Sequence, residues 1–299
     1  MTDSAGSGDH GEVPIELSVV IPAFNASSTI GAQLEALVAQ TWPADWEVVV
    51  ADNGSTDDTR EIVSTIAASK SRVRLVDAAA TPGPSAARNR GVAAARGRSI
   101  AFCDADDVVS PGWLAAIGES LRDHSAVTGP QEIGLLNPTW LWGVYGTRQA
   151  SELQMFEGIF PFGPTANLGV RRDLFIGMGG FDESLHVGED LDLCLRLWAR
   201  DVSLEFVPSA GVHYRYREEA RARWRQAYLY GRSAPAVAAR LAALGAATPS
   251  HWAGAKRWVW LVRRLPSLRT RAGRARWLVV AGTSVGRILG SVQHRWLML

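Results

Sequence analysis

The sequence predicts an α/β fold with a mainly parallel central sheet and helices on both faces. Short apolar, β-branched runs alternate with helical segments through the first third of the chain, which is the pattern of right-handed βαβ units. Turn-forming and acidic residues follow several of these runs directly. The hydrophobic content of 47% in 299 residues is enough for one large domain and an appendage.

Each element follows from its own residues. The first expected strand, 17–21, is apolar and ends at Pro22, and residues 25–28 have the N-cap chemistry that precedes a helix at 30–40. The same unit then repeats, with turn-rich or Pro-Gly segments between its parts. The further elements expected in this series are strands at 47–51, 73–76 and 99–103 and helices at 58–68 and 85–95.

The run at 99–103 ends in three carboxylates, Asp104, Asp106 and Asp107. Residues two apart on an extended segment project to the same side, so Asp104 and Asp106 can converge on one cation. Hard oxygen ligands of this kind suit Mg²⁺ or Mn²⁺. A solvated acidic loop is the alternative, because this short motif is common.

Three loops are expected to meet at one edge of the sheet. They are 22–25, 52–56 and 104–107, and each follows a parallel strand. In open α/β sheets, ligands bind beyond the carboxyl ends of the strands. The sequence therefore predicts one ligand site that all three loops form.

These loops belong to a series of motifs that resembles the family 2 glycosyltransferases with the GT-A fold. The order and spacing of the motifs are similar to those of the family, and the resemblance covers roughly residues 17–217. The segments that carry it are 18–25, 50–57, 87–91, 102–107, 165–172, 179–183 and 188–196.

The resemblance implies a UDP-, GDP- or dTDP-sugar donor. The family contacts the base and ribose through the first two loops, and a guanidinium at the position of Arg88 approaches the donor. Turn chemistry is the alternative for Asp52, and a solvated basic helix face for Arg88. The residues that the resemblance places on the donor are Pro22, Ala23, Asn25, Asp52, Arg88, Asp104, Ala105 and Asp106.

The resemblance also implies a divalent metal, Mg²⁺ or Mn²⁺. Asp104 and Asp106 are similar to the DXD motif, in which the first acid contacts ribose or metal and the second holds the metal against the diphosphate. His213 is a further candidate ligand, although a single histidine at a strand end is commonly structural. Asp107 is expected to cap the turn before Pro111.

The catalytic carboxylates are expected on the acceptor side. Glu189 and Asp190 begin an amphipathic helix, and the resemblance implies that Asp190 is the general base while Glu189 orients the acceptor or its loop. Attack opposite the leaving group would invert the anomeric centre. Helix capping is the alternative for both carboxylates.

The chain is expected to divide into four parts. These are a disordered leader (1–14), a nucleotide-sugar-binding half (15–110), an acceptor-binding half (111–217) and a helical basic extension (218–299). The leader lacks the apolar core of a signal peptide, and the two cysteines, Cys103 and Cys194, lie in apolar segments. We therefore expect reduced core thiols and a cytoplasmic catalytic part.

The extension has an unusual charge. From residue 220 onwards there are 15 Lys or Arg and no Asp or Glu, a net +15, whereas the preceding residues have 16 basic and 30 acidic side chains, a net −14. Tryptophans interleaved with basic residues suit a helix in a membrane interface and would fit a glycan or lipid-linked acceptor. The alternative is an appendage that packs on the domain. No nucleic-acid partner is expected.

Two other functions are compatible with parts of the sequence. A non-catalytic membrane- or nucleic-acid-binding protein on this scaffold is supported by the extension alone, and the four acids Asp104, Asp106, Glu189 and Asp190 argue against it. A sugar-nucleotide pyrophosphorylase would need a Gly-rich first loop, which 22–25 lacks. The processive relatives' Gln-x-x-Arg-Trp motif has Ala220 in place of Gln, which favours non-processive transfer.

Overall fold

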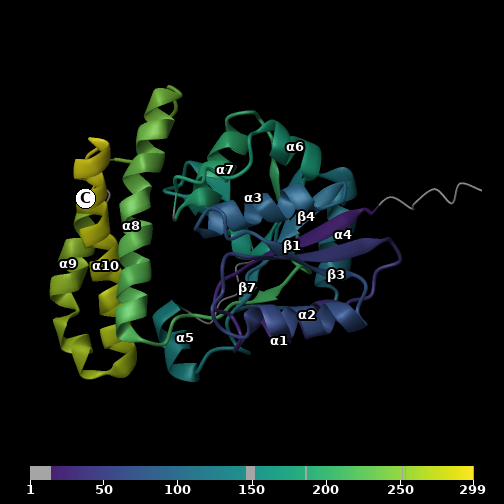
Figure 1. The fold of residues 1–299 in the computed structure, drawn as a ribbon. Coiled ribbons are helices and arrows are strands. Elements are labelled where there is room, and N and C mark those ends of the chain that lie inside the picture. The colour runs from purple at the N-terminus through teal and green to yellow at the C-terminus, as the bar shows by residue number, and fades with distance from the viewer. Residues whose placement is uncertain (1–14, 146–151, 186, 251, 253, 299) are drawn as a thin grey trace, which may run out of the picture.

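The protein has a seven-stranded central sheet with the strand order β11-β6-β10-β4-β1-β2-β3 (Figure 1). The predicted leader, 1–14, lies outside the described residues. The fold is taken from a computed structural model that describes residues 15–145, 152–185, 187–250, 252 and 254–298.

One half of this sheet is parallel, as the sequence predicts. β1 pairs in parallel with β2 on one side and β4 on the other, and β2 pairs with β3. Each observed strand lies within two residues of its predicted bounds. These strands are β1 (Leu17–Ala23), β2 (Trp46–Asp52), β3 (Val73–Asp77) and β4 (Ser99–Phe102).

The other half contains an antiparallel strand, which is not among the strands predicted from the sequence. β10 (Leu168–Arg171) runs antiparallel to both β4 and β6 (Ala126–Thr128), and β11 (Leu204–Phe206) pairs in parallel with β6. These strands have only three or four residues, too few for a clear alternation of apolar and polar residues. Through β10, β6 and β11, the sheet continues beyond β4 with both parallel and antiparallel pairs.

Helices cover both faces of the sheet. One apolar core joins the sheet to α1 (Ile30–Val38), α2 (Thr59–Ser69) and α4 (Trp113–Asp123). The opposite core joins it to α3 (Pro84–Ala94), α6 (Arg172–Gly177) and α7 (Glu189–Trp198). Cys103 and Cys194 are free and buried in these cores, as predicted.

Smaller elements bring distant segments to the carboxyl edge of the sheet. β12 (Val212–His213) pairs with β5 (Val108–Val109) and β7 (Gln131–Glu132), so the residues after His213 lie beside the acidic loop. The remaining elements here are α5 (Thr139–Tyr145), the hairpin β8 (Gln154–Phe156) and β9 (Phe160–Phe162), and the 3₁₀ helix η1 (Thr165–Asn167).

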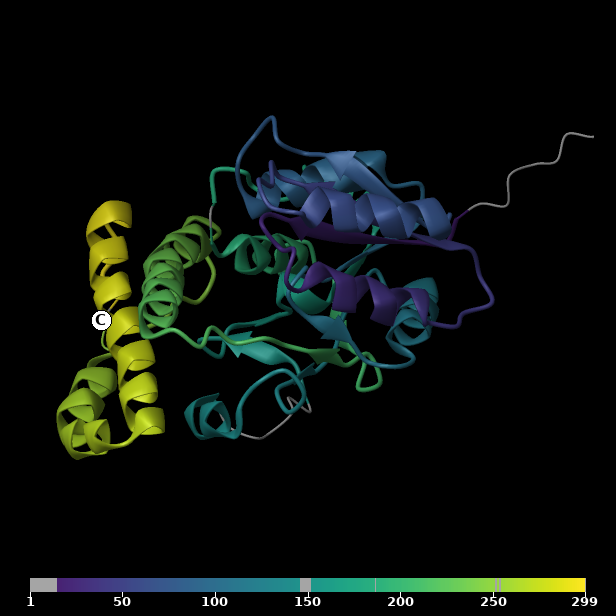
Figure 2. The same cartoon turned by 60° about the horizontal axis from the view of Figure 1, so that its bottom comes forward.

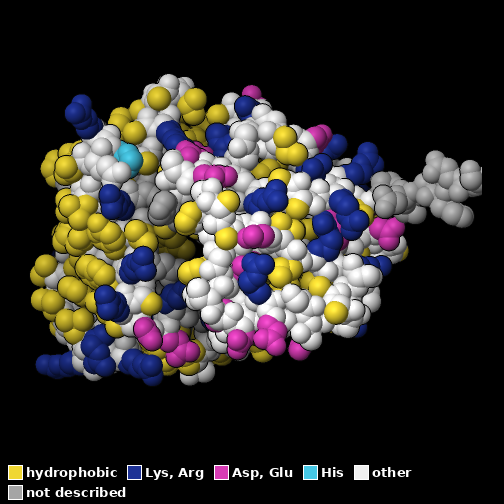
Figure 3. All heavy atoms as spheres, in the orientation of Figure 1, with side chains coloured by type: hydrophobic (Ala, Val, Ile, Leu, Met, Phe, Trp, Pro, Cys, Tyr) yellow, Lys and Arg dark blue, Asp and Glu magenta, His cyan; other side chains and the backbone are white. Residues whose placement is uncertain are grey.

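The described residues from 220 onwards form a helical unit along one side of the α/β domain. α8 (Ala220–Ala243) lies between the domain and α10 (Arg271–His294), and α9 (Ala255–Arg263) and the 3₁₀ helix η2 (Leu265–Arg269) lie beside α10 (Figures 1 and 2). Hydrophobic side chains gather on the outer surface of this unit (Figure 3). None of the helices in the described part of the chain has the length and apolar character needed to cross a bilayer.

Glycines let α8 and α10 pack at backbone distance. A Cβ at Gly286 would lie 2.1 Å from the carbonyl oxygen of Tyr228, and one at Gly290 would lie 2.4 Å from that of Arg232. Gly231 on α8 is equally close to Thr283 on α10. The two helices therefore run in parallel with almost no side chain between them at these positions. The helical character expected for the extension is confirmed by α8, α9 and α10, while the four-part division of the chain stays a prediction.

Candidate active site

The first two loops of the predicted site are joined by hydrogen bonds. The side-chain carbonyl of Asn25 accepts the N–H of Thr56 at 2.9 Å, and Asp57 accepts the N–H of Ser27 at 3.0 Å. Asn25 has a φ of 49°, a left-handed conformation that asparagine tolerates better than most residues. The loops after β1 and β2 therefore form one polar surface.

Asp52 lies at the end of β2 and is fully buried. Its carboxylate forms an ion pair with Arg60 at 2.7 Å and accepts the N–H of Ser55 at 3.3 Å. Pro22 and Ala23 end the neighbouring strand, and the Ala23 carbonyl accepts the N–H of Asn53 at 2.8 Å. The turn chemistry considered for Asp52 is thus present, and its contact with a nucleobase stays a prediction.

The acidic loop gathers three carboxylates. One oxygen from each of Asp104, Asp106 and Asp107 lies within 4.8 Å of the others. Gln33 on α1 holds this loop at both ends, because its amide donates to the Asp104 carbonyl at 3.1 Å and accepts the N–H of Val109 at 3.0 Å. The β-strand geometry that predicted convergence of Asp104 and Asp106 is replaced by a turn, which adds Asp107 to the group.

The acidic loop fits a divalent cation. Burial and the charge of Asp104 raise the pKa of Asp106, and the pKa of Asp107 is raised well above its usual value for the same two reasons. The Oδ2 atom of Asp107 is buried and has no hydrogen-bond partner among the residues that the structure describes. Carboxylates that repel one another and include an unpaired buried oxygen are stabilised by a hard cation.

Asp107 also has a structural contact that differs from the expected turn cap. Its Oδ1 accepts the N–H of Arg215 at 2.8 Å, which ties the segment after β12 to the acidic loop. Ala105, predicted on the donor, is buried in the same loop. The loop is therefore held from α1 on one side and from residue 215 on the other.

Arg88 connects the acidic loop to the start of α7. This side chain on α3 is only 4% exposed, and its Nη2 lies 2.7 Å from Asp104 while its Nη1 lies 2.9 Å from Glu189. The solvated basic face considered for this position is wrong for Arg88. Its predicted contact with the donor stays a prediction, since both terminal nitrogens bind carboxylates in the structure.

Asp190 is next to this bridge and has a strongly shifted pKa. Burial, followed by the negative charge of Glu189, raises the pKa of Asp190 to about 7. Glu189 is itself 8% exposed and lies 3.4 Å from the hydroxyl of Thr165. A carboxylate with a pKa near neutrality can exchange a proton with a substrate hydroxyl at physiological pH.

His213 lies apart from the carboxylate group. Its Nε2 is 3.3 Å from the hydroxyl of Ser110, and its Nδ1 is 3.2 Å from a carboxylate oxygen of Glu132. Within the described ranges, the one group of three acidic, histidine or cysteine side chains that could hold a metal does not include it. A role of His213 as a metal ligand stays a prediction.

The segment after His213 supplies site residues that were not predicted from the sequence. Arg217 pairs with Asp106 at 3.0 Å, and the Nε of Arg215 donates to the Asp106 carbonyl at 2.9 Å. Desolvation and the charges of Asp190, Glu189 and Asp104 raise the pKa of Tyr230 on α8 to about 12, although 53% of the surface of this residue is exposed. The run of aromatic and basic residues at 214–217 was the available signal, but only the pairing of β12 with β5 shows where it lies.

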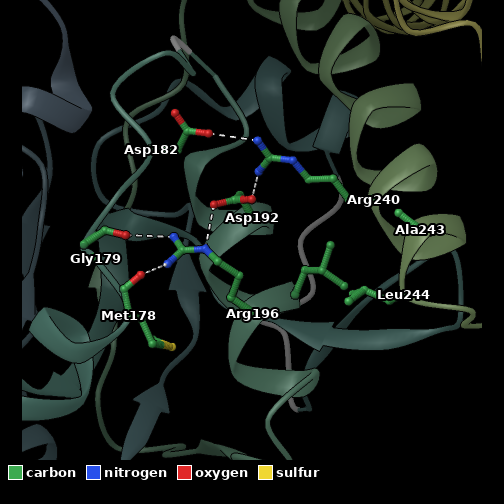
Figure 4. Close-up of a pocket in the computed structure, with 10 residues that line it drawn as sticks. Met178, Gly179, Asp182, Asp192, Arg196, Arg240, Ala243 and Leu244 are labelled. Atoms are coloured by element: carbon green, nitrogen blue, oxygen red, sulfur yellow. Dashed lines mark hydrogen bonds and ion pairs between the residues drawn. The ribbon is translucent and has the colours of Figure 1, made fainter.

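A separate pocket lies between α7 and α8. It has a volume of about 480 Å³, and Arg240 on α8 reaches across it to Asp192 and, at 2.8 Å, to Asp182 (Figure 4). Asp192 also pairs with Arg196 at 2.9 Å. None of the predicted site residues lines this pocket, and its charges pair with one another. The ion pair between Arg240 and Asp192 joins α8 to α7, the helix that begins with Glu189 and Asp190.

The chain matches known protein families over most of its length. The family described as "Glycosyl transferase family 2" matches residues 18–178, and the one described as "Glycosyl transferase family group 2" matches residues 99–297. Together these matches include both acidic motifs and the helical unit.

Two relatives of known description show similarity in sequence. A pre-mycofactocin glycosyltransferase of Mycobacterium tuberculosis is 29% identical over 283 residues, which cover 91% of this chain and 57% of that protein. The UDP-Glc:α-D-GlcNAc-diphosphoundecaprenol β-1,3-glucosyltransferase WfgD of Escherichia coli is 38% identical over 99 residues, 33% of this chain and 36% of that protein. The chain thus spans about half or less of these relatives.

One solved structure shows the same fold. The mannosyltransferase PcManGT from Pyrobaculum calidifontis, in complex with GDP-Man and Mn²⁺, superimposes with a TM-score of 0.63 at 20% identity and covers 91% of this chain and 87% of that chain. The central sheet and its surrounding helices are therefore those of the GT-A fold.

Proposed function

The chain belongs to the family 2 glycosyltransferases, and we propose that it is a metal-dependent, inverting enzyme that transfers one sugar from a nucleotide-sugar donor to an acceptor hydroxyl. The observation that carries the proposal is the bridge through Arg88. One buried guanidinium binds both Asp104 of the acidic loop and Glu189 beside Asp190. Arg88 thus brings together Asp104 on the proposed donor side and Glu189 on the proposed acceptor side, which are 85 positions apart in the sequence.

The acidic loop would hold the metal and the donor's diphosphate. Asp106 is the principal ligand in this proposal, with Asp104 and Asp107 completing the carboxylate group. Mg²⁺ or Mn²⁺ bound there would offset the charge that develops on the departing nucleoside diphosphate. The loops that contain Asn25 and Asp52 would bind the base and ribose of a UDP-, GDP- or dTDP-sugar.

Asp190 is the proposed general base. Its carboxylate takes the proton of the acceptor hydroxyl while the acceptor oxygen attacks the anomeric carbon. The bond between that carbon and the diphosphate oxygen breaks, and the electron pair leaves with the nucleoside diphosphate. A single attack opposite the leaving group inverts the anomeric centre. Glu189, fixed by Arg88, orients the acceptor or its loop.

The acceptor and the location form the second part of the proposal. We propose a lipid-linked or cell-envelope glycan as acceptor, with the protein in the cytoplasm and peripheral at the membrane. The support is the acceptor in the name of the relative WfgD and the +15 charge of the helical unit. Sugar addition without polymer extrusion fits the absence of the Gln-x-x-Arg-Trp motif from the sequence.

The test is a turnover assay with purified protein, a series of nucleotide sugars and Mn²⁺. Asp106→Asn should abolish metal-dependent turnover, and Asp190→Asn should abolish transfer while donor binding persists. Asp173→Asn, an exposed acid on α6 outside the site, is the control and should leave the rate unchanged. Full activity in a chelator would contradict metal dependence, and near-normal turnover by Asp190→Asn would move the base elsewhere.

A further inference from the structure

The outer face of the helical unit exposes an unusual set of large apolar side chains. On α9 and η2, Val259 is 53% exposed, Val262 68% and Leu265 50%; on α10, Val292 is 75% exposed. Val259 and Val262 on α9 are three positions apart, as are Leu289 and Val292 on α10, and residues at this spacing lie on one side of an α-helix. We define the outer face by Trp258, Val259, Val262, Leu265, Ile288, Leu289 and Val292, all of which are more than a third exposed.

These side chains are next to uncompensated positive charge. Lys256, Arg263, Arg264 and Arg269 are all exposed, and none forms an ion pair among the residues that the structure describes. The acidic partner that reaches this unit at α9 and α10, Glu157, binds Arg257 and Arg287 instead. In Figure 3, hydrophobic side chains cover this side of the molecule, with Lys and Arg at its upper and lower ends.

We propose that the outer face docks on an anionic bilayer surface, with its apolar side chains at the level of the acyl-chain boundary and its basic side chains on the lipid phosphates. Amphipathic helices that combine exposed Trp and Leu with Lys and Arg bind membranes in this way, and anionic lipids attract clustered basic residues. A nucleic acid is a less suitable partner. Binding to its phosphate backbone requires basic side chains, but it does not explain the exposed valines and leucines of this face.

Charge also argues against a second copy of the chain as the occupant. Residues 220–299 have no acidic side chain, so two such faces in contact would oppose like charges without partners. An anionic lipid surface supplies the complementary charge and an apolar interior at once. The observations therefore favour lipid over self-association.

This docking would set the position of the proposed active site relative to the membrane. The outer face belongs to α9, η2 and α10, and α8 lies between them and the α/β domain (Figure 2). Tyr230 on α8 lies close enough to Asp190 and Glu189 for their negative charges to contribute to its raised pKa. One helix layer thus separates the lipid-facing surface from the catalytic carboxylates. The inference deepens the proposed location, but its test does not require catalysis.

The experiment is co-sedimentation of the full chain with sucrose-loaded vesicles, in the absence of donor and acceptor. Phosphatidylcholine vesicles are compared with vesicles in which about one third of the lipid is phosphatidylglycerol. We expect binding to the anionic vesicles that is at least about tenfold tighter than to the neutral ones and that weakens as NaCl is raised. The double variant Val262→Glu/Val292→Glu should lose this binding.

The control is Ile176→Glu, which adds one such glutamate at a 51% exposed apolar residue of α6, outside the helical unit. It should bind anionic vesicles as the natural sequence does. Light scattering on the same samples measures the oligomeric state. The proposal would be overturned if the natural sequence forms a dimer and the double variant Val262→Glu/Val292→Glu is a monomer.

Three further results would also reject it. They are no binding to anionic vesicles, equal binding to neutral vesicles, and tighter binding to a mixed-sequence oligonucleotide than to vesicles. The salt titration uses the natural sequence, so the proposal stays testable if the double variant does not fold. A negative result here with full glycosyl transfer in solution would reject docking alone.

Discussion

Arg88 is 4% exposed and has a full positive charge, so its burial depends on the two carboxylates that it binds, Asp104 and Glu189. A planar guanidinium can bind two carboxylates at once in a fixed geometry, whereas an ammonium is a single point of charge. The bridge therefore fixes the distance between the acidic loop and the start of α7. It also separates two negative groups that would repel each other.

The bridge leads to a prediction for Arg88→Lys. The lysine keeps the charge but cannot hold both carboxylates, so kcat should fall on the order of 100-fold through misplacement of the reacting groups. Arg90→Lys on the same helix is the control, because Arg90 is exposed and, within the described part of the chain, its side chain donates only to the Asp77 carbonyl. Steady-state kinetics with saturating donor measure the effect. An unchanged kcat for Arg88→Lys would make the bridge purely structural.

The pKa of Asp190 gives a prediction for pH dependence. Since burial and Glu189 raise this pKa to about 7, the carboxylate form that accepts a proton is lost as the pH falls below that value. The rate should rise with pH up to about 7 and then level off. The measurement is kcat/KM across the neutral range. A rate that did not change between about pH 6 and about pH 8 would contradict the assignment.

At the level of elements, strands and helices with a clear apolar period could be predicted from the sequence. β1 to β4 and the helices between them lie within two residues of their expected bounds. β10 could not be predicted, because four residues give no reliable period and its antiparallel pairing depends on β4 and β6. The loop positions of Asp104 and Asp106 followed from parallel topology, but their contacts with Arg88 and Arg217 depend on tertiary packing.

The contact between α8 and α10 allows a paired glycine test. Gly286→Ala would place a Cβ 2.1 Å from the Tyr228 carbonyl oxygen, so the helices must separate, at a cost of about 1–3 kcal/mol. Gly31→Ala on α1 meets no atom within 4 Å and should stabilise the protein by up to about 1 kcal/mol through helix propensity. Urea unfolding measures both changes. Equal effects of the two substitutions would show that close packing is unimportant.

At the level of the whole molecule, the proposed site draws on both halves of the chain. The acidic loop comes from the first half, Asp190 from the second, and Arg217 and Tyr230 from the junction with the helical unit and from α8 itself. The expected boundary at 217 therefore runs through the site. The acidic part of the chain holds the carboxylates, and the unit with a net charge of +15 lies along one side of that part (Figure 1).

This assembly predicts strong stabilisation by the correct nucleotide. A nucleoside diphosphate present with Mn²⁺ at 100 times its Kd binds only the folded chain and adds about 2.7 kcal/mol, which raises Tm by about 4 °C for a protein of this size. A thermal-shift comparison of UDP, GDP and dTDP identifies the donor base. Asp106→Asn should remove the Mn²⁺-dependent part of the shift, because the diphosphate then has no metal to bind. The absence of a shift with all three nucleotides would contradict the proposed donor site, since its loops and carboxylates come from segments that only the native fold brings together.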